Sequence, residues 1–264
     1  MTIFLDEEKL MKTVPSVFAS GGSEHTSSKY GFIPTINTIR ALGDAGFYPV
    51  SAKQSGTRIE GRESFVKHMI RFRRAGELEM GGMFPEVVLI NSHDGTTSYQ
   101  LRAGIYRLVC MNGLIVGDES YTLRVKHQGG DIINRVVNGA LELTEQFPST
   151  IGIAQRWKEI ELSPTVRLQY AERASKLKWM NEEVDVKPEA LLIPRRAEDK
   201  KTDLWTTFNT VQENVMRGGL RYSYRNPEGM LKRSTTRQVK SVHENQRVNI
   251  GLWSLSKELA EVMA

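Results

Sequence analysis

The middle of the chain contains consecutive hydrophobic runs with the patterns of β-strands. Residues 87–90 (VVLI) are apolar in both alternation phases, which is typical of a strand covered on both faces and predicts the central strand of a sheet. Apolar and polar residues alternate over 99–102 (YQLR), residues 105–111 are apolar apart from Arg107, and 114–116 (LIV) form a further short run. Together these runs predict an antiparallel meander.

Glycine-containing dipeptides between these runs predict the turns of the meander. Asp94-Gly95 is a strong hairpin signal, because glycine adopts positive φ without strain and aspartate can hydrogen-bond to its own backbone. Asn112-Gly113 predicts a second turn. Further strands are predicted over 48–52, 64–74 and 121–125. Partial alternation in the second of these predicts that its arginines point outward: Arg71, Arg73 and Arg74.

Five segments have apolar residues at helical spacing: 35–45, 131–147, 165–179, 203–217 and a last helix from Asn249. The segment 203–217 has the clearest ends, since Asp203 can cap its start and Gly218-Gly219 ends it. The face opposite its apolar stripe is expected to be solvated rather than in contact with a ligand. That face carries Thr206, Asn209, Thr210 and Glu213.

The order of these elements predicts an α+β fold, in which an antiparallel β-meander is packed by helices on one side and is followed by a C-terminal helical and basic subdomain. Residues 1–29 have little periodicity and contain Ser20-Gly21-Gly22-Ser23, so we expect a flexible N-terminal arm. The α+β core is expected over 30–186. Residues 187–264 are expected to form the C-terminal helices and basic segment, packed on the core.

Composition places the chain among cytoplasmic proteins. Charged residues make up 25% and hydrophobic residues 39%, which is ordinary for a soluble protein. No apolar run approaches the roughly 18 residues of a membrane span, and acidic residues stand near the N-terminus where a signal peptide would be basic. We therefore expect no membrane contact. The single cysteine, Cys110, excludes an intramolecular disulfide, and its apolar surroundings predict a buried thiol.

Positive charge is concentrated in one segment. Between Arg217 and Arg247 lie eight basic and two acidic residues, a net charge of +6, whereas the whole chain carries +5. Within the segment, Arg221-Tyr222-Ser223-Tyr224-Arg225 alternates cations with aromatic residues, so a strand would place the tyrosines on one face and the arginines on the other. Single-stranded nucleic-acid binders use cations for phosphates and aromatic rings for bases.

Two motifs and the segment that follows them resemble a known family. The residues that carry the resemblance are the pair NSHDG and GIYRLVCMNGLIV (91–95 and 104–116) and the segment DLWTTFNTVQENVMRGG (203–219), which is followed by a basic stretch and NIGLWSLS. Together they resemble the uncharacterised phage and plasmid proteins grouped as domain of unknown function 932. The resemblance runs from about residue 32 to about residue 260. It implies an origin in a phage, prophage or plasmid, and it implies no reaction or catalytic residue. Its motif residues of unknown role are Asn91, Ser92, His93, Asp94, Gly95, Arg107, Asn112, Gly113, Asp203, Trp205, Asn209, Gln212, Glu213 and Asn214.

The NSHDG segment contains residue types that are used in catalysis. Ser92, His93 and Asp94 are adjacent, however, and consecutive side chains of an extended segment point to opposite faces, which disfavours a hydrolytic triad. A metal site could recruit His93 and Asp94 together with His68 or His127, although no helical metal-ligand spacing is present. The alternative is a polar turn whose side chains satisfy backbone groups. No glycine-rich phosphate loop occurs, and we expect no cofactor.

The leading functional hypothesis is nucleic-acid binding without an enzymatic reaction, with single-stranded DNA as the favoured partner during replication or recombination of a mobile element. An oligomer of the chain could promote annealing. The expected contacts are Arg221, Tyr222, Tyr224, Arg225, Lys232, Arg233, Arg237 and Lys240, with Arg71 and Arg73. One alternative is an effector that binds a host protein through the meander and the polar face of the 203–217 helix. Another is a metal-dependent hydrolase centred on His93 and Asp94.

Overall fold

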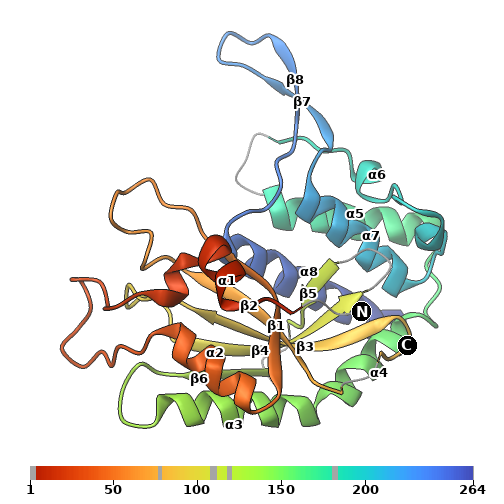
Figure 1. Ribbon diagram of the computed structural model, residues 1–264. Helices are drawn as coiled ribbons and strands as arrows, with labels where there is room; N and C mark the ends of the chain where they lie inside the picture. The colour runs from red at the N-terminus through yellow and green to blue at the C-terminus, as the bar shows by residue number, and fades with distance from the viewer. Residues whose placement is uncertain (1–3, 77–78, 108–111, 118–120, 180–183, 264) are drawn as a thin grey trace. The chain divides into compact units, whose positions relative to one another are not determined.

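The computed structural model describes residues 4–76, 79–107, 112–117, 121–179 and 184–263 (Figure 1). The chain divides into two compact units, Met1–Ile151 with Lys240–His243 and Gly152–Val239 with Glu244–Ala264. The division falls inside helix α4 (Phe147–Trp157) rather than near residue 187. In the part of the chain that the structure describes, no helix is long and apolar enough to cross a membrane.

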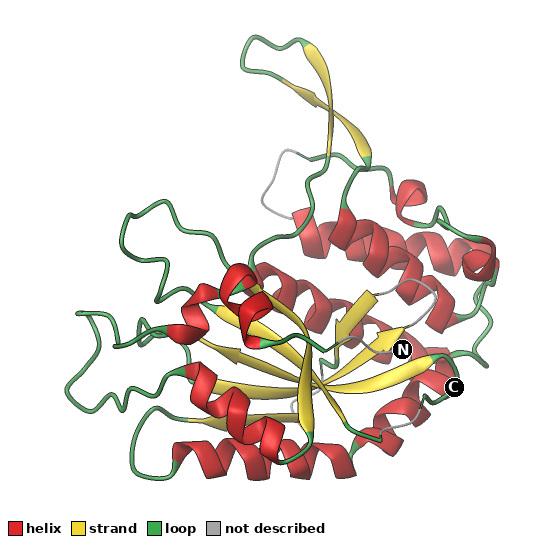
Figure 2. Ribbon diagram, in the orientation of Figure 1, coloured by secondary structure: helices red, strands yellow, loops and turns green. Residues whose placement is uncertain are grey.

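The first unit contains the predicted antiparallel sheet, which has six strands (Figure 2). The strand order is β1-β2-β3-β4-β5, and β6 pairs with β4 beside β5 on the same edge. The strands are β1 (Phe47–Gln54), β2 (His68–Arg74), β3 (Met83–Asn91), β4 (Tyr99–Arg107), β5 (Asn112–Ile115) and β6 (Thr122–Val125). The α+β class predicted from the hydrophobic pattern is therefore confirmed.

The centre of the sheet follows the hydrophobic pattern closely. All four residues of 87–90 are fully buried in β3, as the unbroken apolar run predicts. Gly95 has a φ of 78° in the turn between β3 and β4, which confirms the Asp-Gly hairpin. The prediction of a turn at Asn112-Gly113 is wrong, because both residues lie in β5 and pair with Arg107 and Tyr106. The connection over 108–111, including Cys110, lies outside the described residues.

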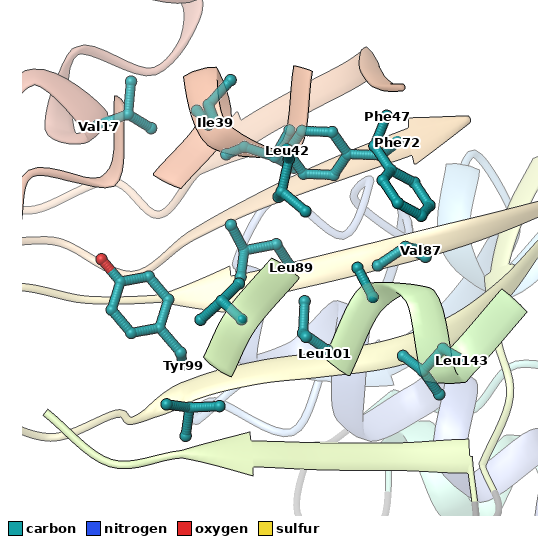
Figure 3. Close-up of a cluster of buried hydrophobic side chains, with 14 of the residues drawn as sticks. Val17, Ile39, Leu42, Phe47, Phe72, Val87, Leu89, Tyr99, Leu101 and Leu143 are labelled. Carbon is teal, nitrogen blue, oxygen red and sulfur yellow. The ribbon is translucent and has the colours of Figure 1, made fainter. Parts of the chain in front are cut away.

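The main hydrophobic core lies between the sheet and helices α2 (Thr35–Asp44) and α3 (Ile132–Glu145), which lie side by side in Figure 1. Alternate residues of the central strands face this core, and Figure 3 shows Val87 and Leu89 among them. The predicted stripe of α3 is confirmed. Its buried members are Ile132, Val136, Ala140 and Leu143, with Phe147 at the start of α4.

The N-terminal segment belongs to the same core, so the expectation of a flexible arm over 1–29 is wrong. Helix α1 (Glu7–Thr13) begins at Asp6, whose side chain accepts a hydrogen bond from the Lys9 amide, and the 3-10 helix η1 (Pro15–Phe18) follows. Leu10, Val14 and Val17 from this segment are buried in the same hydrophobic cluster, and Figure 3 shows Val17 there. The helices are too short to produce a clear periodic signal in the sequence.

The second unit is mainly helical. Its elements are α5 (Pro164–Trp179), α6 (Pro188–Leu191), η3 (Ala197–Lys200), α7 (Leu204–Arg217), the hairpin of β7 (Arg221–Arg225) and β8 (Leu231–Thr235), and most of α8 (Val242–Met263). The last helix starts at Val242, seven residues before the predicted start at Asn249. An aromatic cluster forms the centre of this unit, with Trp157 packed on Trp253 at a ring-centroid distance of 4.6 Å and with Trp205 and Phe208 beside them.

Candidate functional site

The β7–β8 hairpin carries the predicted nucleic-acid contacts in two separate sets. Directly paired residues of an antiparallel ladder share a face, so the pairs Arg221–Thr235, Ser223–Arg233 and Arg225–Leu231 define one face. The pairs Tyr222–Ser234 and Tyr224–Lys232 define the other. The two tyrosine rings lie 6.0 Å apart, which agrees with the predicted separation of tyrosines from arginines. In Figure 1 the hairpin extends away from α5 and α7 of the same unit.

The cations of this hairpin are exposed, and no acidic partner for them lies in the described part of the chain. Among the residues that the structure describes, no carboxylate forms a salt bridge with Arg221, Arg225, Lys232 or Arg233. Arg237 and Lys240, which follow β8, are also exposed. By contrast, the arginines at the ends of the basic segment are paired: Arg217 with Glu213 and Arg247 with Glu244. Within the basic segment, the cations that form no salt bridge with a described carboxylate therefore lie on the hairpin and directly after it.

A surface hollow of about 750 Å³ lies beside the hairpin. Arg221, Arg233 and Lys187 line it together with the hydroxyl of Ser223 and one carboxylate, that of Asp185. Asp185 also forms an isolated antiparallel bridge with Ser223 of β7. Among the described lining residues, three cations face one carboxylate, which favours an anionic group such as a phosphate. Asp185 and Lys187 were not predicted, because they lie more than 30 residues from β7.

Helix α7 fixes the base of the hairpin. Gly218 ends the helix with a φ of 68°, and a Cβ atom there would lie 2.7 Å from the carbonyl oxygen of Thr236, so that only glycine fits. The Gly219 amide donates to the Thr236 carbonyl at 2.8 Å, and the Val239 amide donates to the Met216 carbonyl at 2.9 Å. The Gly-Gly end of the family motif thus closes the loop from which both hairpin strands leave.

The polar face of α7 is buried, which corrects the expectation of a solvated face. Asn209, Gln212, Glu213 and Asn214 are each at most 3% exposed. Their hydrogen bonds hold neighbouring segments of the second unit: Arg196 donates to Glu213, Arg195 to Asn214, Asn214 to the carbonyls of Leu191 and Ile193, and Gln212 to Asn249. Asp203 caps the helix by accepting from the Thr206 amide at 2.8 Å, and Trp205 lies in the aromatic cluster. These motif residues hold the second unit together, and their side chains are buried rather than exposed for contact with a partner.

The arginines of β2 are also placed differently from the prediction. Arg71 and Arg73 are only 7% and 9% exposed, and both donate through Nε to the carboxylate of Glu86, at 2.5 and 2.9 Å. Arg71 also donates to the Leu114 carbonyl, and the guanidinium of Arg73 lies over the rings of Phe84 and Tyr106. The outward orientation expected for these two residues is therefore wrong, whereas Arg74 is exposed.

Two glycines make room for Arg71. A Cβ atom on Gly104 would lie 2.7 Å from Arg71 Nη2, and one on Gly113 would lie 2.7 Å from Arg71 Cζ. The guanidinium can lie flat across β4 and β5 only because both positions lack a side chain. Gly104 and Gly113 of the family motif thus have a steric explanation. Arg107, another motif residue, is buried as well, and the side chain of Asn112 is not described.

Asn91 and His93 belong to a buried hydrogen-bond network centred on the hydroxyl of Thr35. Thr35 Oγ1 lies 2.9 Å from His68 Nε2 and 3.1 Å from His93 Nε2, and it accepts from Asn91 Nδ2 at 3.0 Å. Asn91 Oδ1 accepts from His127 Nε2 at 2.7 Å. The hydroxyl proton of Thr35 and one proton on each histidine ring are enough to form all of these hydrogen bonds. The network therefore fits neutral imidazole rings, which carry one proton each. Burial lowers the pKa of His68 to about 3 and that of His93 to about 4, and it also lowers the pKa of His127.

Asp94 lies in the turn after this network. Its Oδ1 accepts hydrogen bonds from Ser92 Oγ at 2.6 Å, the Thr96 amide at 3.0 Å and Thr96 Oγ1 at 2.7 Å. Burial raises the pKa of this carboxyl, but the three hydrogen bonds outweigh burial and the pKa lies below its usual value. Asp94 therefore satisfies turn groups, as the polar-turn interpretation requires. Ser92, His93 and Asp94 form no triad, because His93 bonds to Thr35 and Ser92 bonds to Asp94.

The predicted metal ligands diverge in the same way. The ring of His93 points into the network with His68, whereas Asp94 lies in the turn. Within the described ranges, no group of three or more His, Cys, Asp or Glu side chains is placed to hold a metal ion. A second hollow, of about 530 Å³, lies at this turn and is lined by residues of the segments 25–30, 94–98 and 126–128. Sequence reasoning missed Thr35, Tyr30 and Thr97, since nothing local connects them to NSHDG.

Comparisons with known proteins agree with the family resemblance. The chain is similar to UPF0380 protein YafZ of Escherichia coli (strain K12), with 38% identity over 255 residues that cover 97% of this chain and 91% of the relative. UPF0380 protein YfjQ of the same strain is 37% identical over 255 residues with the same coverage. No solved structure gives a significant match. A family model described as Domain of unknown function (DUF932) matches residues 23–253, and the chain belongs to this family.

Proposed function

We propose that the chain binds nucleic acid through the β7–β8 hairpin and that single-stranded DNA is the preferred form. The observation that carries the proposal is the arginine face of the hairpin, where Arg221, Arg225 and Arg233 are exposed without a carboxylate partner among the described residues. Guanidinium groups bind phosphate oxygens in a bidentate manner, and the phosphate backbone supplies most of the affinity for nucleic acid.

The opposite face of the hairpin supports the preference for single strands. Tyr222 and Tyr224 are half-buried on that face, with Lys232 paired opposite Tyr224. Unpaired bases stack on aromatic side chains with about 1 to 3 kcal/mol per base, whereas the bases of a duplex are already stacked on each other. A strand that passes round the hairpin would meet cations on one face and rings on the other. The family resemblance supports a role in replication or recombination of a mobile element, with annealing by an oligomer as the most specific form of the proposal.

The test measures binding of labelled single-stranded and duplex DNA by fluorescence anisotropy at about 50 and 200 mM salt, using nuclease-treated protein. We expect Arg221→Ala with Arg233→Ala to weaken binding of both forms about tenfold or more. The salt slope for the single strand should fall by about 1.4, because each lost phosphate contact removes about 0.7. An unchanged affinity and slope would contradict the proposal.

A matched control separates the hairpin from net charge. Arg58→Ala with Arg62→Ala removes the same charge from exposed residues of the first unit. We expect a clearly smaller loss of affinity, and an equal loss would show that only the net charge matters. Tyr222→Leu with Tyr224→Leu tests the strand preference. This double variant should weaken the binding of single-stranded DNA and leave the binding of duplex DNA unchanged. An equal effect on single-stranded and duplex DNA would contradict stacking of bases on the two tyrosines.

A further inference from the structure

The hollow of about 530 Å³ at the Asp94-Gly95 turn has preformed walls. It brings together residues of 25–30, 94–98 and 126–128, all within the first unit. Backbone hydrogen bonds tie these segments to one another: the Ser23 amide donates to the His93 carbonyl at 2.8 Å, and the Gly31 amide donates to the His127 carbonyl at 2.7 Å. Its volume is within the range of about 300 to 1,000 Å³ that is typical of small-molecule sites.

The hollow contains a buried polar atom that has no hydrogen-bond partner in the described ranges. Thr97 is 3% exposed and lines the hollow, and its hydroxyl has no hydrogen-bond partner among the described residues. Burying a hydroxyl without a partner is unfavourable, so a ligand that bonds to Thr97 would relieve that cost. Asp94 provides a second acceptor position, because the hydrogen bonds that it accepts from Ser92 and Thr96 all reach Oδ1 and no other residue in the described part of the chain donates to Oδ2.

The lining specifies the kind of ligand. A carboxylate from Asp94 and an ammonium group from Lys126 line the same hollow, and no salt bridge joins them in the described part of the chain. An anionic ligand would be repelled by Asp94 and a cationic ligand by Lys126, so the lining favours a neutral ligand. Hydroxyl side chains are the commonest polar groups in the lining, and they both donate and accept. The rings of Tyr30 and His127, which also line the hollow, stack at a centroid distance of 4.7 Å.

We infer that this hollow binds a small neutral polyhydroxy compound, of the size of a monosaccharide. The hydroxyl groups of such a ligand would donate to Asp94 Oδ2 and exchange hydrogen bonds with Thr97, and its C–H groups would contact the aromatic rings. Binding of this kind requires no reaction and is separate from the hairpin of the second unit. It assigns a ligand to the hollow beside the NSHDG motif.

The experiment titrates the ¹⁵N-labelled full chain with pentoses, hexoses and inositol, and in separate samples with inorganic phosphate and L-serine. We expect at least one polyhydroxy compound to shift the backbone amides of Gly95 and Thr97 saturably at concentrations of about 10 mM or below. Phosphate and serine should leave these amides unchanged. If no polyhydroxy compound binds, or if phosphate or serine binds there instead, the inference is overturned.

Two variants test the contacts. Thr97→Val removes the hydroxyl at nearly constant volume, and we expect at least fivefold weaker binding with a melting temperature that is unchanged or higher, because the hydroxyl is buried without a hydrogen-bond partner among the described residues of the free protein. Asp94→Asn should weaken binding at least tenfold. Thr235→Val, at an exposed position of the hairpin, is the control and should leave sugar affinity unchanged. Full affinity in Thr97→Val would rule out the proposed contact.

Discussion

Strands β2 and β7 both alternate arginine with aromatic residues, but the surroundings of those arginines differ in the two units. On β2, the neighbouring strand β3 supplies Glu86, and glycines on β4 and β5 leave space for the guanidinium of Arg71. On β7, the neighbouring strand β8 supplies Lys232 and Arg233, which add positive charge. The comparison shows that the charge of the adjacent strand determines whether an arginine is neutralised inside the fold or remains exposed without a carboxylate partner among the described residues.

The largest effect should come from removing the shared carboxylate. Glu86→Gln keeps the shape of the side chain and removes the carboxylate that the two buried guanidinium groups of Arg71 and Arg73 share, so we expect a loss of about 3 to 5 kcal/mol in the free energy of unfolding. Urea denaturation of the variant and of the wild-type chain measures this difference in the free energy of unfolding. Glu228→Gln, the same substitution in the exposed hairpin, is the control and should change stability by less than about 0.5 kcal/mol. A similar loss of stability in Glu86→Gln and Glu228→Gln would contradict the proposed difference between the buried arginines of β2 and the exposed hairpin.

Acid should destabilise the first unit through its buried histidines, whereas the hairpin contains none. His68 and His93 have folded pKa values of about 3 and about 4, because burial disfavours the charged ring, against 6.5 for an exposed histidine. The unfolded chain therefore takes up protons that the folded chain does not. Stability is full above pH 6.5 and declines as the pH falls toward 4, by roughly 2 kcal/mol per histidine between pH 7 and pH 5.

Urea denaturation at pH 7, 6 and 5 measures this decline. His25→Ala, at an exposed histidine, is the control and should leave the pH dependence unchanged. Thr35→Val, which removes the hydroxyl shared by His68 and His93, should lower stability at pH 7, since it leaves buried ring nitrogens without a partner. Equal stability of the wild-type chain at pH 7 and pH 5 would contradict the assignment of neutral imidazoles.

A smaller effect is expected where a glycine makes room for Arg71. Gly104→Ala places a methyl group 2.7 Å from both Arg71 Nη2 and a Val88 methyl, which is closer than van der Waals contact allows. We expect this overpacking to lower the free energy of unfolding by about 1 to 3 kcal/mol. Gly43→Ala in helix α2 is the control, because no atom lies within 4 Å of its Cβ position. It should be neutral or stabilise by up to about 1 kcal/mol. Thermal unfolding of the two variants distinguishes a steric role of Gly104 from a general intolerance of alanine.

The smallest effect on stability is expected from the hairpin. Arg221→Ala with Arg233→Ala should change the free energy of unfolding by less than about 0.5 kcal/mol, because neither side chain is buried or forms a salt bridge with a described residue. The same variant is expected to lose nucleic-acid affinity. A loss of more than about 1 kcal/mol in urea denaturation would mean that these arginines support the fold, as those of β2 do.

Local sequence signals were sufficient for most elements of the fold. The apolar run at 87–90, the Asp94-Gly95 turn and the caps of α7 each depend on neighbours within a few residues, and the structure confirms them. The α+β class follows from their order. The short N-terminal helices and the start of α8 were missed because their signals are weak without the core against which they pack.

The sequence by itself determined the strands, the main helices except α4, and the position of the positive charge, because hydrophobic period and turn chemistry act over short distances. Only the tertiary structure decided which polar residues are buried. Glu86 reaches Arg71 across adjacent strands, Thr35 of helix α2 joins His68 and His93, and α7 buries its polar face against 191–196. Each of these pairings joins residues at least 15 positions apart, and no local pattern encodes such a contact.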